Sequence, residues 1–324
     1  MEKIYLVITI DCECDKSLNW KSSNPLSFTS IIDGIPNILQ PLFDKYKAIP
    51  TYLLSNEVLE DSKSVEILGK LKGNYEYGTQ LHADYIEPNK RYDKYAGTLT
   101  IDFQKDYPPE IEKAKINNLT ILFEKVLGYK PRSFRAGRFG MSDYTLSILN
   151  DLGYWVDSSI SPYLVWENGV STISYINSDV TPYRPTYMLN GSIVASKIIE
   201  VPVTISITNF GYAFIKQILP FFPINIKNMA HKIVGKLLCK WLRPSLSSTE
   251  EMIIISENII NKSKENIIVL NMMFHSMEIM PGKSPYAKDE KDQMRILNRI
   301  ENYLRYCHYR GIQFSTLSNI SSII

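Results

Sequence analysis

Three acidic residues directly follow an apolar run near the start of the chain. Residues 4–10 (Ile-Tyr-Leu-Val-Ile-Thr-Ile) are apolar, aromatic or β-branched, which predicts a buried β-strand. Asp11, Glu13 and Asp15 follow at every second position, and side chains at this spacing share one face of a strand. Carboxylates crowded on one face repel one another, so a bound cation or a raised pKa must relieve them. The sequence therefore predicts a cation or acid–base site here, and the alternative is the start of a solvated loop.

Further residues able to do chemistry follow later apolar segments. His82, Arg135, Asp157 and His275 each stand at or just after the end of a predicted strand. Imidazole and carboxylate groups bind divalent cations, and histidine titrates near neutral pH, so it can take or give a proton. An arginine facing carboxylates is typical of functional sites. The alternatives are a structural, hydrogen-bonded histidine at position 82 and a structural ion pair between Arg135 and Asp157.

These residues are positioned by predicted strands that alternate with predicted helices. Apolar runs predict strands over residues 4–10, 48–55, 75–82, 133–135, 154–156, 198–205, 267–274 and 313–317. Helical spacing of apolar residues predicts helices over residues 28–46, 56–72, 109–127, 249–263 and 289–310. We expect Asn56 to cap the second helix, Ser142 to cap a further helix, and Gly128 and Gly311 to end helices.

The alternation of strands and helices predicts an α/β fold with a parallel sheet. About eight such units, with polar residues confined to the strand ends, favour a (β/α) barrel over an open sheet. We expect residues 1–324 to form a single domain, because barrels of this length are common single units. Residues 161–246 are many for one or two crossovers, which indicates an insertion.

The composition is that of an ordinary soluble globular protein. A charged fraction of 22%, a hydrophobic fraction of 44% and a net charge of +2 give no general attraction to nucleic acid. The four cysteines form no C-x-x-C pair, which favours a reducing compartment. The apolar run before Asp11 is too short for a signal peptide, and no segment is long and apolar enough to span a bilayer. We therefore expect a cytoplasmic protein.

One segment is basic and amphipathic. Residues 201–248 contain no acid and six bases among large apolar residues, and we expect an insertion over about 207–246. Such a segment can lie on an anionic bilayer, which predicts peripheral membrane contact through 213–243. The alternative is an insertion helix that packs on the barrel with its basic face in solvent. The sequence does not predict an oligomeric state.

Five strand-end motifs occur in an order that resembles a known family. They are Thr-Ile-Asp-Cys-Glu at 9–13, Gly-Thr-Gln-Leu-His at 78–82, Phe-Arg-Ala-Gly-Arg-Phe-Gly at 134–140, Val-Asp-Ser at 156–158 and Phe-His-Ser-Met-Glu at 274–278. Their order and spacing resemble the polysaccharide deacetylase family, the NodB-homology group also called carbohydrate esterase family four. The resemblance covers nearly the whole chain and implies a distorted (β/α) barrel of about seven to eight parallel strands, in a divergent cytoplasmic member.

The resemblance also implies roles for individual residues. By position, Asp11 is the general base, Glu13 binds a divalent metal, and His275 is the general acid. Arg135 falls where the family places the arginine that steadies the base. Asp157 falls where an acid orients that arginine.

The metal site departs from the pattern of the family. His82 matches one metal ligand, and the metal implied is Zn, but a second histidine is missing at four residues before or after it. Gln80 shares a strand face with His82 and is the first substitute, with Asp15, Asp84 or Glu87 as alternatives. Cys12 also stands where many members have a second aspartate. Backbone N–H groups near Arg138 and Phe139 are candidates for holding an oxyanion.

Together these features predict a hydrolase that removes an N-acetyl or O-acetyl group from a sugar or polysaccharide precursor by metal-assisted attack of water. The expected partner is an N-acetylated sugar or glycan. One alternative is a hydrolase of another carbon–nitrogen bond on the same barrel. A second is an inactive glycan-binding relative that uses aromatic residues as stacking platforms, among them Tyr163, Trp166, Tyr183 and Tyr187.

Overall fold

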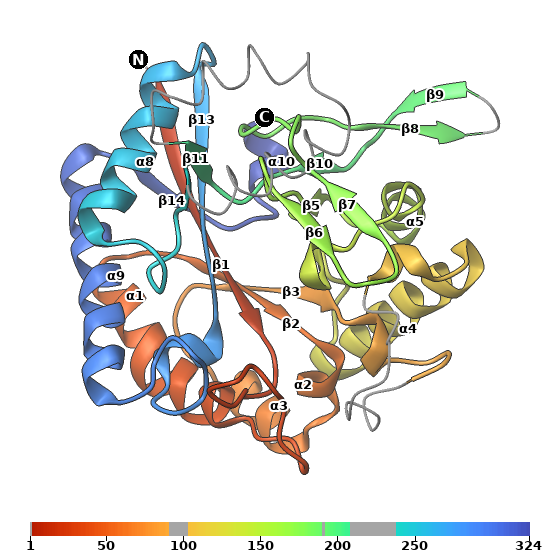
Figure 1. Ribbon diagram of the computed structural model, residues 1–324, viewed down its shortest axis with the longest axis horizontal. Helices are drawn as coiled ribbons and strands as arrows, with labels where there is room; N and C mark the ends of the chain where they lie inside the picture. The colour runs from red at the N-terminus through yellow and green to blue at the C-terminus, as the bar shows by residue number, and fades with distance from the viewer. Residues whose placement is uncertain (1, 91–102, 190–191, 208–237) are drawn as a thin grey trace.

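A parallel β-sheet of eight strands organises the molecule. The computed structural model describes residues 2–90, 103–189, 192–207 and 238–324. Within these residues the strands follow the order β10-β5-β4-β3-β2-β1-β13, and β14 pairs with β1 (Figure 1). Their bounds are β1 Lys3–Cys12, β2 Pro50–Leu54, β3 Glu76–Leu81, β4 Ser133–Ala136, β5 Val156–Asp157, β10 Ile199–Glu200, β13 Ile267–His275 and β14 Gln313–Ser315. The predicted distorted (β/α) barrel of seven to eight parallel strands is confirmed.

The barrel is incomplete between its two outer strands, β10 and β13. No strand ladder joins them in the described part of the chain. The segment after β10 crosses the gap, because the N–H of Thr204 donates to the carbonyl of Asn271 at 3.0 Å, and the N–H of Asn271 donates to the hydroxyl of Thr204 at 2.7 Å. The segment after β10 therefore lies against β13 and closes this side of the barrel.

β1 pairs with three strands, β2, β13 and β14, and its two faces differ. Leu6, Ile8 and Ile10 lie in the large core cluster that packs against the helices. Alternation directs Thr9 and Asp11 to the opposite, inner face. β13 pairs with β1 in parallel from Lys3 opposite Ile267 to Asp11 opposite His275. This register fixes two of the predicted site residues side by side.

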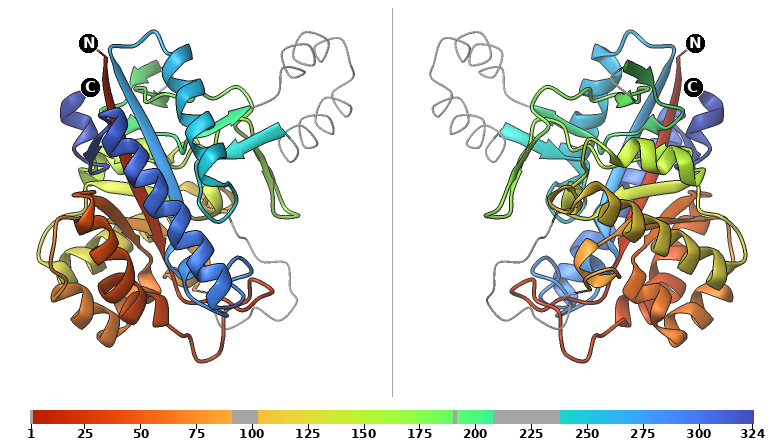
Figure 2. Two further views of the ribbon diagram at one scale, coloured as in Figure 1. Left: turned by 90° about the vertical axis from the view of Figure 1, so that its left-hand side faces the viewer. Right: turned by 90° about the vertical axis from the view of Figure 1, so that its right-hand side faces the viewer.

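Helices surround the sheet. The longer ones are η1 Ser30–Leu39 (a π-helix), α1 Gln40–Lys45, α2 Asn56–Glu60, α3 Ser62–Gly69, α4 Pro109–Leu127, α5 Thr145–Leu152, α8 Thr249–Lys262 and α9 Glu290–Arg310. Short helical turns follow the strand ends: η2 Ala83–Tyr85, η4 Gln104–Asp106, η5 Gly137–Phe139 and η7 Ser276–Ile279, with α10 Ile320–Ile323 at the end. α8 and α9 lie beside β1 and β13, and α4 and α5 lie at the other side of the barrel (Figures 1 and 2).

Local sequence signals predict some helix ends correctly. Gly128 and Gly311 end α4 and α9 in the left-handed conformation, with φ of 82° and 76°, as expected for glycine after a helix. The predicted helix over 56–72 is wrong in one respect, because it is two helices. The Asp61 side chain accepts the N–H of Ser64 and caps α3, and Asn56 lies inside α2, where its amide donates to the carbonyl of Tyr85. Asp61 interrupts the helix because an aspartate at an N-cap competes with helical backbone bonds.

Two further expectations need correction. Ser142 does not cap α5, which begins at Thr145; its hydroxyl accepts the N–H of Tyr144 and donates to Glu112. The predicted strand over 198–205 is divided, since β10 ends at Glu200 and β11 spans Ile205–Ile207. Pro202 lies between them and has no N–H for a ladder.

The long connection expected over 161–246 contains small antiparallel sheets of two strands each. They are β6 Val165–Glu167 with β7 Thr172–Ser174, β8 Thr186–Leu189 with β9 Ser192–Ala195, and β11 with β12 Cys239–Trp241. The basic insertion predicted at 207–246 and the membrane contact through 213–243 lie outside the described residues, apart from residue 207 and residues 238–246. Among the helices that are described, none is both long and apolar enough to cross a membrane. All four cysteines are buried with free thiols.

Candidate active site

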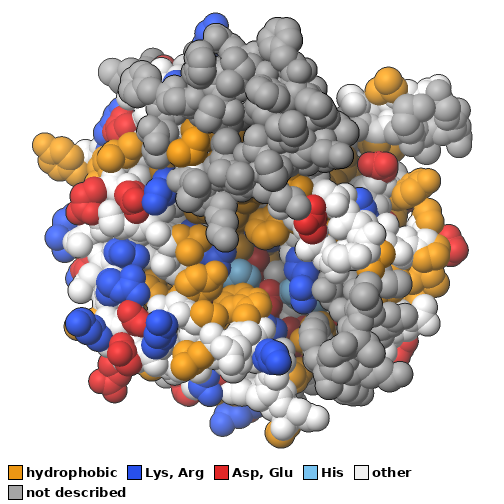
Figure 3. Space-filling view, viewed as in Figure 1, with side chains coloured by type: hydrophobic (Ala, Val, Ile, Leu, Met, Phe, Trp, Pro, Cys, Tyr) orange, Lys and Arg blue, Asp and Glu red, His pale blue; other side chains and the backbone are white. Residues whose placement is uncertain are grey.

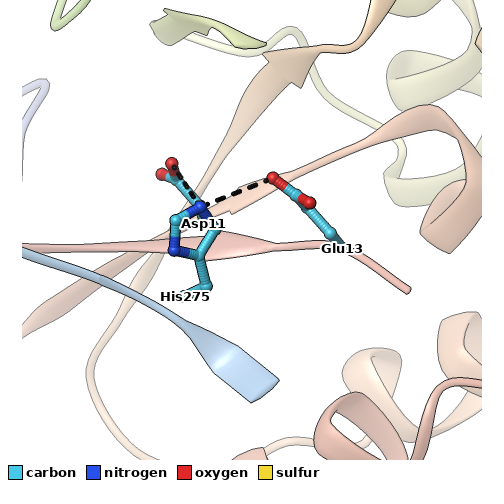
Figure 4. Close-up of side chains that lie close together, drawn as sticks. All are labelled: Asp11, Glu13 and His275. Atoms are coloured by element: carbon cyan, nitrogen blue, oxygen red, sulfur yellow. Dashed lines mark ion pairs between the residues drawn. The ribbon is translucent and has the colours of Figure 1, made fainter. Parts of the chain in front are cut away.

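The register of β1 and β13 brings Asp11, Glu13 and His275 together (Figure 4). Nε2 of His275 lies 3.8 Å from Oδ2 of Asp11 and 3.7 Å from Oε1 of Glu13. The two carboxylates are almost fully buried, whereas the His275 side chain is 13% exposed. In Figure 3 histidine and acidic side chains lie in a hollow near the centre of the face, among hydrophobic side chains. Solvent and a small ligand can therefore reach the imidazole edge of the cluster.

Arg135 fixes one oxygen of Asp11. Its Nη1 donates to Oδ1 of Asp11 at 2.6 Å, and its Nη2 donates to the hydroxyl of Thr9 at 2.8 Å. Nε and Nη2 also donate to the carbonyl and the hydroxyl of Ser158, at 2.9 and 2.8 Å. A guanidinium held at so many points cannot rotate, so Asp11 is oriented with its second oxygen toward His275.

Asp157 does not make the contact with Arg135 that the sequence suggested. Among the described residues, Ser158 makes it instead, and Asp157 accepts the hydroxyl of Ser159 at 2.5 Å and pairs with Glu200. Burial raises the pKa of Asp157 to about 6, and the hydrogen bonds to Ser159 and Glu200 oppose part of this shift. The reason is strand alternation: residues 157 and 158 point to opposite faces, and the serine faces the arginine.

Gln80 and His82 both contact Glu13. The amide nitrogen of Gln80 donates to Oε1 of Glu13 at 2.9 Å and to Oδ2 of Asp11 at 3.2 Å, and Nε2 of His82 lies 2.7 Å from Oε1 of Glu13. Burial alone would raise the pKa of Glu13, but His82 and Lys16 hold it well below its usual value. Burial alone would lower the pKa of His82, yet Glu13 raises it above the usual value. Glu13 and His82 therefore form a buried, mutually stabilising pair.

Lys16 is a buried cation that sequence reasoning missed. Its Nζ lies 3.5 Å from Oε2 of Glu13, and it donates to Cys14 Sγ at 3.2 Å and to the Ser22 hydroxyl at 3.1 Å. Burial opposes its charge, but Glu13 and Cys14 raise the pKa of the ammonium group. Its spacing of three residues from Glu13 was a weak available signal.

Glu278 and Arg243 orient His275, and sequence reasoning also missed them. Oε1 of Glu278 lies 2.6 Å from Nδ1 of His275 and accepts the backbone N–H of His275 at 3.1 Å. Arg243 forms an ion pair with Glu278. Burial opposes ionisation of Glu278, but Arg243 and His275 lower its pKa to about 2. The His-x-x-Glu spacing could have indicated Glu278, whereas no local pattern indicates Arg243.

Asp15 does not join the carboxylate cluster. The alternation of side chains ends where β1 ends, at Cys12. The Asp15 carboxylate is buried and accepts the hydroxyl of Ser27 at 2.7 Å and the N–H groups of Thr29 and Ser30 at 2.7 and 3.1 Å. Its role is to fasten the chain before η1, so the expectation of three carboxylates on one face is wrong for this residue.

Arg138 and Phe139 lie at the tight turn η5 after β4. Both have left-handed backbone, with φ of 55° and 56°. The Phe139 ring lies 5.9 Å from the guanidinium carbon of Arg135, and its carbonyl accepts the hydroxyl of Tyr175 at 2.6 Å. The turn therefore borders the cluster, and an oxyanion role for its N–H groups stays a prediction.

The cluster has a donor set that suits a divalent cation. Ligand atoms of Asp11, Glu13 and His275 lie within 4.8 Å of one another. Among the described residues, this is the group of acids, histidines or cysteines whose ligand atoms lie close enough together to hold a metal ion. Two carboxylates and an imidazole suit zinc and other divalent metals. The carbonyl oxygen of Gln80 is buried and has no hydrogen-bond partner in the described structure, so it is available as a further oxygen donor. Asp84 accepts the hydroxyl of Tyr107, and Glu87 accepts the N–H of Lys90. Both acids lie outside this group.

Comparison with known proteins shows a shared fold. No protein-family model and no curated protein sequence matches the chain. The fold matches that of a Mycobacterium smegmatis protein assigned as a polysaccharide deacetylase, with a TM-score of 0.55, 14% identity and coverage of 100% of this chain and 91% of the other. It also matches Puue allantoinase (TM-score 0.55, 11% identity, 99% and 90% covered). A Pseudomonas aeruginosa PAO1 protein assigned as a polysaccharide deacetylase is similar as well (TM-score 0.52, 12% identity, 99% and 90% covered).

Proposed function

We propose that this protein is a hydrolase of the polysaccharide deacetylase family that removes an acetyl group from an N-acetylated or O-acetylated sugar or glycan. The observation that carries the proposal is that Asp11 and His275 lie side by side at the carboxyl ends of β1 and β13. Arg135 orients Asp11, and Glu278 orients His275. A fixed carboxylate beside an oriented imidazole supplies a base and an acid within reach of one substrate. The fold shared with assigned polysaccharide deacetylases supports the choice of substrate class.

In this proposal Asp11 is the general base. Arg135 occupies Oδ1, so Oδ2 is the oxygen that accepts the proton of the attacking water. Gln80 donates its amide to the same Oδ2 at 3.2 Å, which limits the directions from which a water can approach. A base oriented in this way contributes about 10²- to 10⁴-fold to the rate.

His275 is the proposed general acid. Glu278 lies against Nδ1, which favours the tautomer with the proton on that nitrogen and leaves Nε2 facing Asp11 and Glu13. Protonated at Nε2, the ring can donate to the departing amine or alcohol. One nitrogen cannot donate a proton while it ligates a metal, so a role as acid and a role as ligand exclude each other.

Glu13 and His82 are the residues proposed to hold a divalent cation, with Zn the expected metal. Such a cation, when bound, lowers the pKa of a water and polarises the acyl carbonyl. Glu13 offers Oε1 beside His82, and rotation of the Gln80 amide would add its carbonyl oxygen. Lys16 keeps Oε2 of Glu13 turned to the other side.

The test is acetate release from N-acetylated sugars by the purified protein, with added zinc or cobalt and after chelation. We expect Asp11→Asn to lower the rate by about 10²- to 10⁴-fold. Asp15→Asn is the matched control, because Asp15 is a buried carboxylate of the same segment that fastens the backbone away from the cluster. Equal turnover by Asp11→Asn and wild type would remove the proposed base.

The choice between the two roles of His275 has its own measurement. Zinc affinity is determined by titration calorimetry for wild type, His82→Gln and His275→Gln. The proposal expects a large loss of affinity in His82→Gln and little loss in His275→Gln. The reverse result would make His275 the ligand.

A second candidate is hydrolysis of another carbon–nitrogen bond. The absence of a second metal-ligating histidine near His82, with Gln80 as its candidate substitute, favours this alternative. A fold shared with an allantoinase also favours it. A panel of linear and cyclic amides without a sugar separates the two, because only the second candidate predicts turnover of these compounds in preference to N-acetyl sugars.

A further inference from the structure

A tryptophan stands beside His275 without a role in the proposed reaction. Trp20 lies in the loop between β1 and η1, and its indole meets the His275 imidazole edge-on, with ring centroids 5.2 Å apart. The ring of Tyr286 lies against it at 5.7 Å. Trp20 is 37% exposed, so one part of the indole packs against the cluster and another part remains open to solvent.

The loop holds this indole in place through its backbone. The N–H of Ser17 donates to the carbonyl of Lys21 at 2.7 Å, and the N–H of Trp20 donates to the carbonyl of Ser17 at 2.9 Å. At the base of the loop the N–H of Lys16 donates to the carbonyl of Lys283 at 3.0 Å. The turn that carries Trp20 is therefore tied both to itself and to the segment after η7.

The backbone of Trp20 is strained. Its φ is 60°, in the left-handed region, which is unfavourable for a residue with a side chain. Strained residues that persist at the edge of a site are a reason to look for a function there. Burial does not explain the strain, because more than a third of the residue is exposed.

Trp166, one of the aromatic residues predicted from the sequence to stack on a glycan, is less suited to this role. The ring of Trp166 stacks on Phe139, with centroids 5.5 Å apart, and its indole N–H donates to Ser161 at 2.7 Å. Within the described structure the indole N–H of Trp20 has no hydrogen-bond partner. Trp20 thus combines an open apolar ring and a free donor next to His275.

We infer that Trp20 is a specificity-determining residue that stacks on the apolar C–H face of the pyranose ring bearing the acetyl group, with its N–H available to a hydroxyl of that sugar. The inference rests on the proposed function. Indole rings provide a large, rigid apolar surface with a polar handle at one edge, which matches a sugar ring. A small acetyl amide without a sugar has no such face, so stacking on Trp20 does not increase its affinity.

The kinetic test compares tetra-N-acetylchitotetraose with 4-nitroacetanilide as acetyl donors. For Trp20→Ala we expect KM for the tetrasaccharide to rise about 5- to 10-fold with kcat nearly unchanged, and both constants for the anilide to stay at wild-type values. Trp20→Phe should restore most of the affinity for the tetrasaccharide. Leu18→Ala is the matched control, because Leu18 is 50% exposed in the same turn.

Two kinetic outcomes overturn the inference. Wild-type KM for the tetrasaccharide in Trp20→Ala would show that the indole does not contact the sugar. An equal loss on both donors would show that Trp20 only supports His275.

A binding experiment separates this inference from the proposed reaction. The indole N–H resonance of Trp20 in ¹⁵N-labelled protein is identified as the one missing in Trp20→Phe, and tetra-N-acetylchitotetraose is added. The inference expects this resonance to shift, whereas that of Trp155, exposed elsewhere on the surface, does not. A shift without acetate release would support stacking of Trp20 on the sugar and contradict the deacetylase activity. A resonance that does not shift would contradict the stacking.

Discussion

At the scale of single residues, each group of the candidate cluster is held in place by a neighbouring charged or polar side chain. Arg135 holds Asp11, Glu278 holds His275, and Lys16 with His82 holds Glu13. All of these side chains are buried or nearly so, and buried charges remain ionised only when they are paired. The geometry of the site therefore depends on its charge pairs, and the substitution of a supporting residue should affect both stability and rate.

Glu278→Gln tests the support of His275. We expect a loss of stability on the order of 3 kcal/mol, because Arg243 keeps a buried charge without its partner, and a fall in kcat of about 10- to 100-fold. The pKa of Glu278 is lowered from 4.5 to about 2, so the folded state binds fewer protons than the unfolded chain in this range. The stabilisation by Glu278 is thus complete above about pH 4.5 and is lost as the pH falls toward 2.

The measurement is the free energy of unfolding in urea between pH 3 and pH 6. The difference in the free energy of unfolding between wild type and Glu278→Gln should become smaller as the pH is lowered. Glu110→Gln, an exposed glutamate in the first turn of α4, serves as the control and should show no such narrowing. A constant difference across this range would contradict the assigned charge pair.

At the scale of elements, the loops after the strands are fastened by buried polar side chains. Lys115, on α4, donates to the carbonyls of Ala83 and Ile86 at 2.7 Å each and also to the carbonyl of Pro88. These carbonyls belong to the turn that directly follows His82. The position of His82, a candidate metal ligand directly after β3, therefore depends on a lysine of a neighbouring helix.

Lys115→Met should destabilise the protein by about 3 kcal/mol or more, because several buried carbonyls lose their donor. Lys113→Met is the matched control on the same helix. Lys113 is exposed and pairs with Asp151 on the surface, so its replacement should change the free energy of unfolding by at most about 0.5 kcal/mol. Chemical denaturation measures both variants, and equal stabilities would show that the turn is held by other contacts.

The junction of β5 and β10 contains a pair of buried carboxyl groups, Asp157 and Glu200. Burial raises the pKa of Asp157 to about 6 and that of Glu200 well above its usual value. The folded state therefore keeps protons that the unfolded chain releases, so stability should fall as the pH rises from about 4 through 6 and beyond.

Glu200→Gln removes one of the two acids without a large change in volume. We expect the loss of stability between pH 5 and pH 8 to be smaller in this variant than in wild type by about 1–3 kcal/mol. Urea denaturation at the two pH values provides the measurement. A steeper loss in the variant would show that the pair is not a shared-proton site.

At the scale of the whole molecule, β1 and β13 join the two ends of the chain in one ladder. They pair over nine positions, and β14 adds a further strand to β1. One large core cluster runs from Ile4 to Ile312. A single domain over residues 1–324 stays a prediction, as do cytoplasmic location and contact of residues 213–243 with a membrane.

A single domain predicts one cooperative unfolding transition. Far-ultraviolet circular dichroism and tryptophan fluorescence should give the same midpoint in urea, because the four tryptophans are spread between positions 20 and 241. Two separate midpoints would instead indicate that the segment around the insertion folds independently of the barrel.

The sequence by itself determined most of the strands and helices and indicated the residues of the candidate cluster. Apolar runs and helical spacing are local properties, so β1, α4 and α9 could be predicted from them, and the motifs at the strand ends indicated Asp11, Glu13, Arg135 and His275. Only the tertiary structure decided how these residues are supported. Arg135 contacts Asp11 across 124 positions of the chain and Arg243 contacts Glu278 across 35, and such contacts leave no periodic signal. The same holds for Asp15, which lies beyond the end of β1, because the direction of a side chain there depends on which partner the folded chain brings to it. The contact between Ser158 and Arg135 likewise depends on which strand lies beside β4.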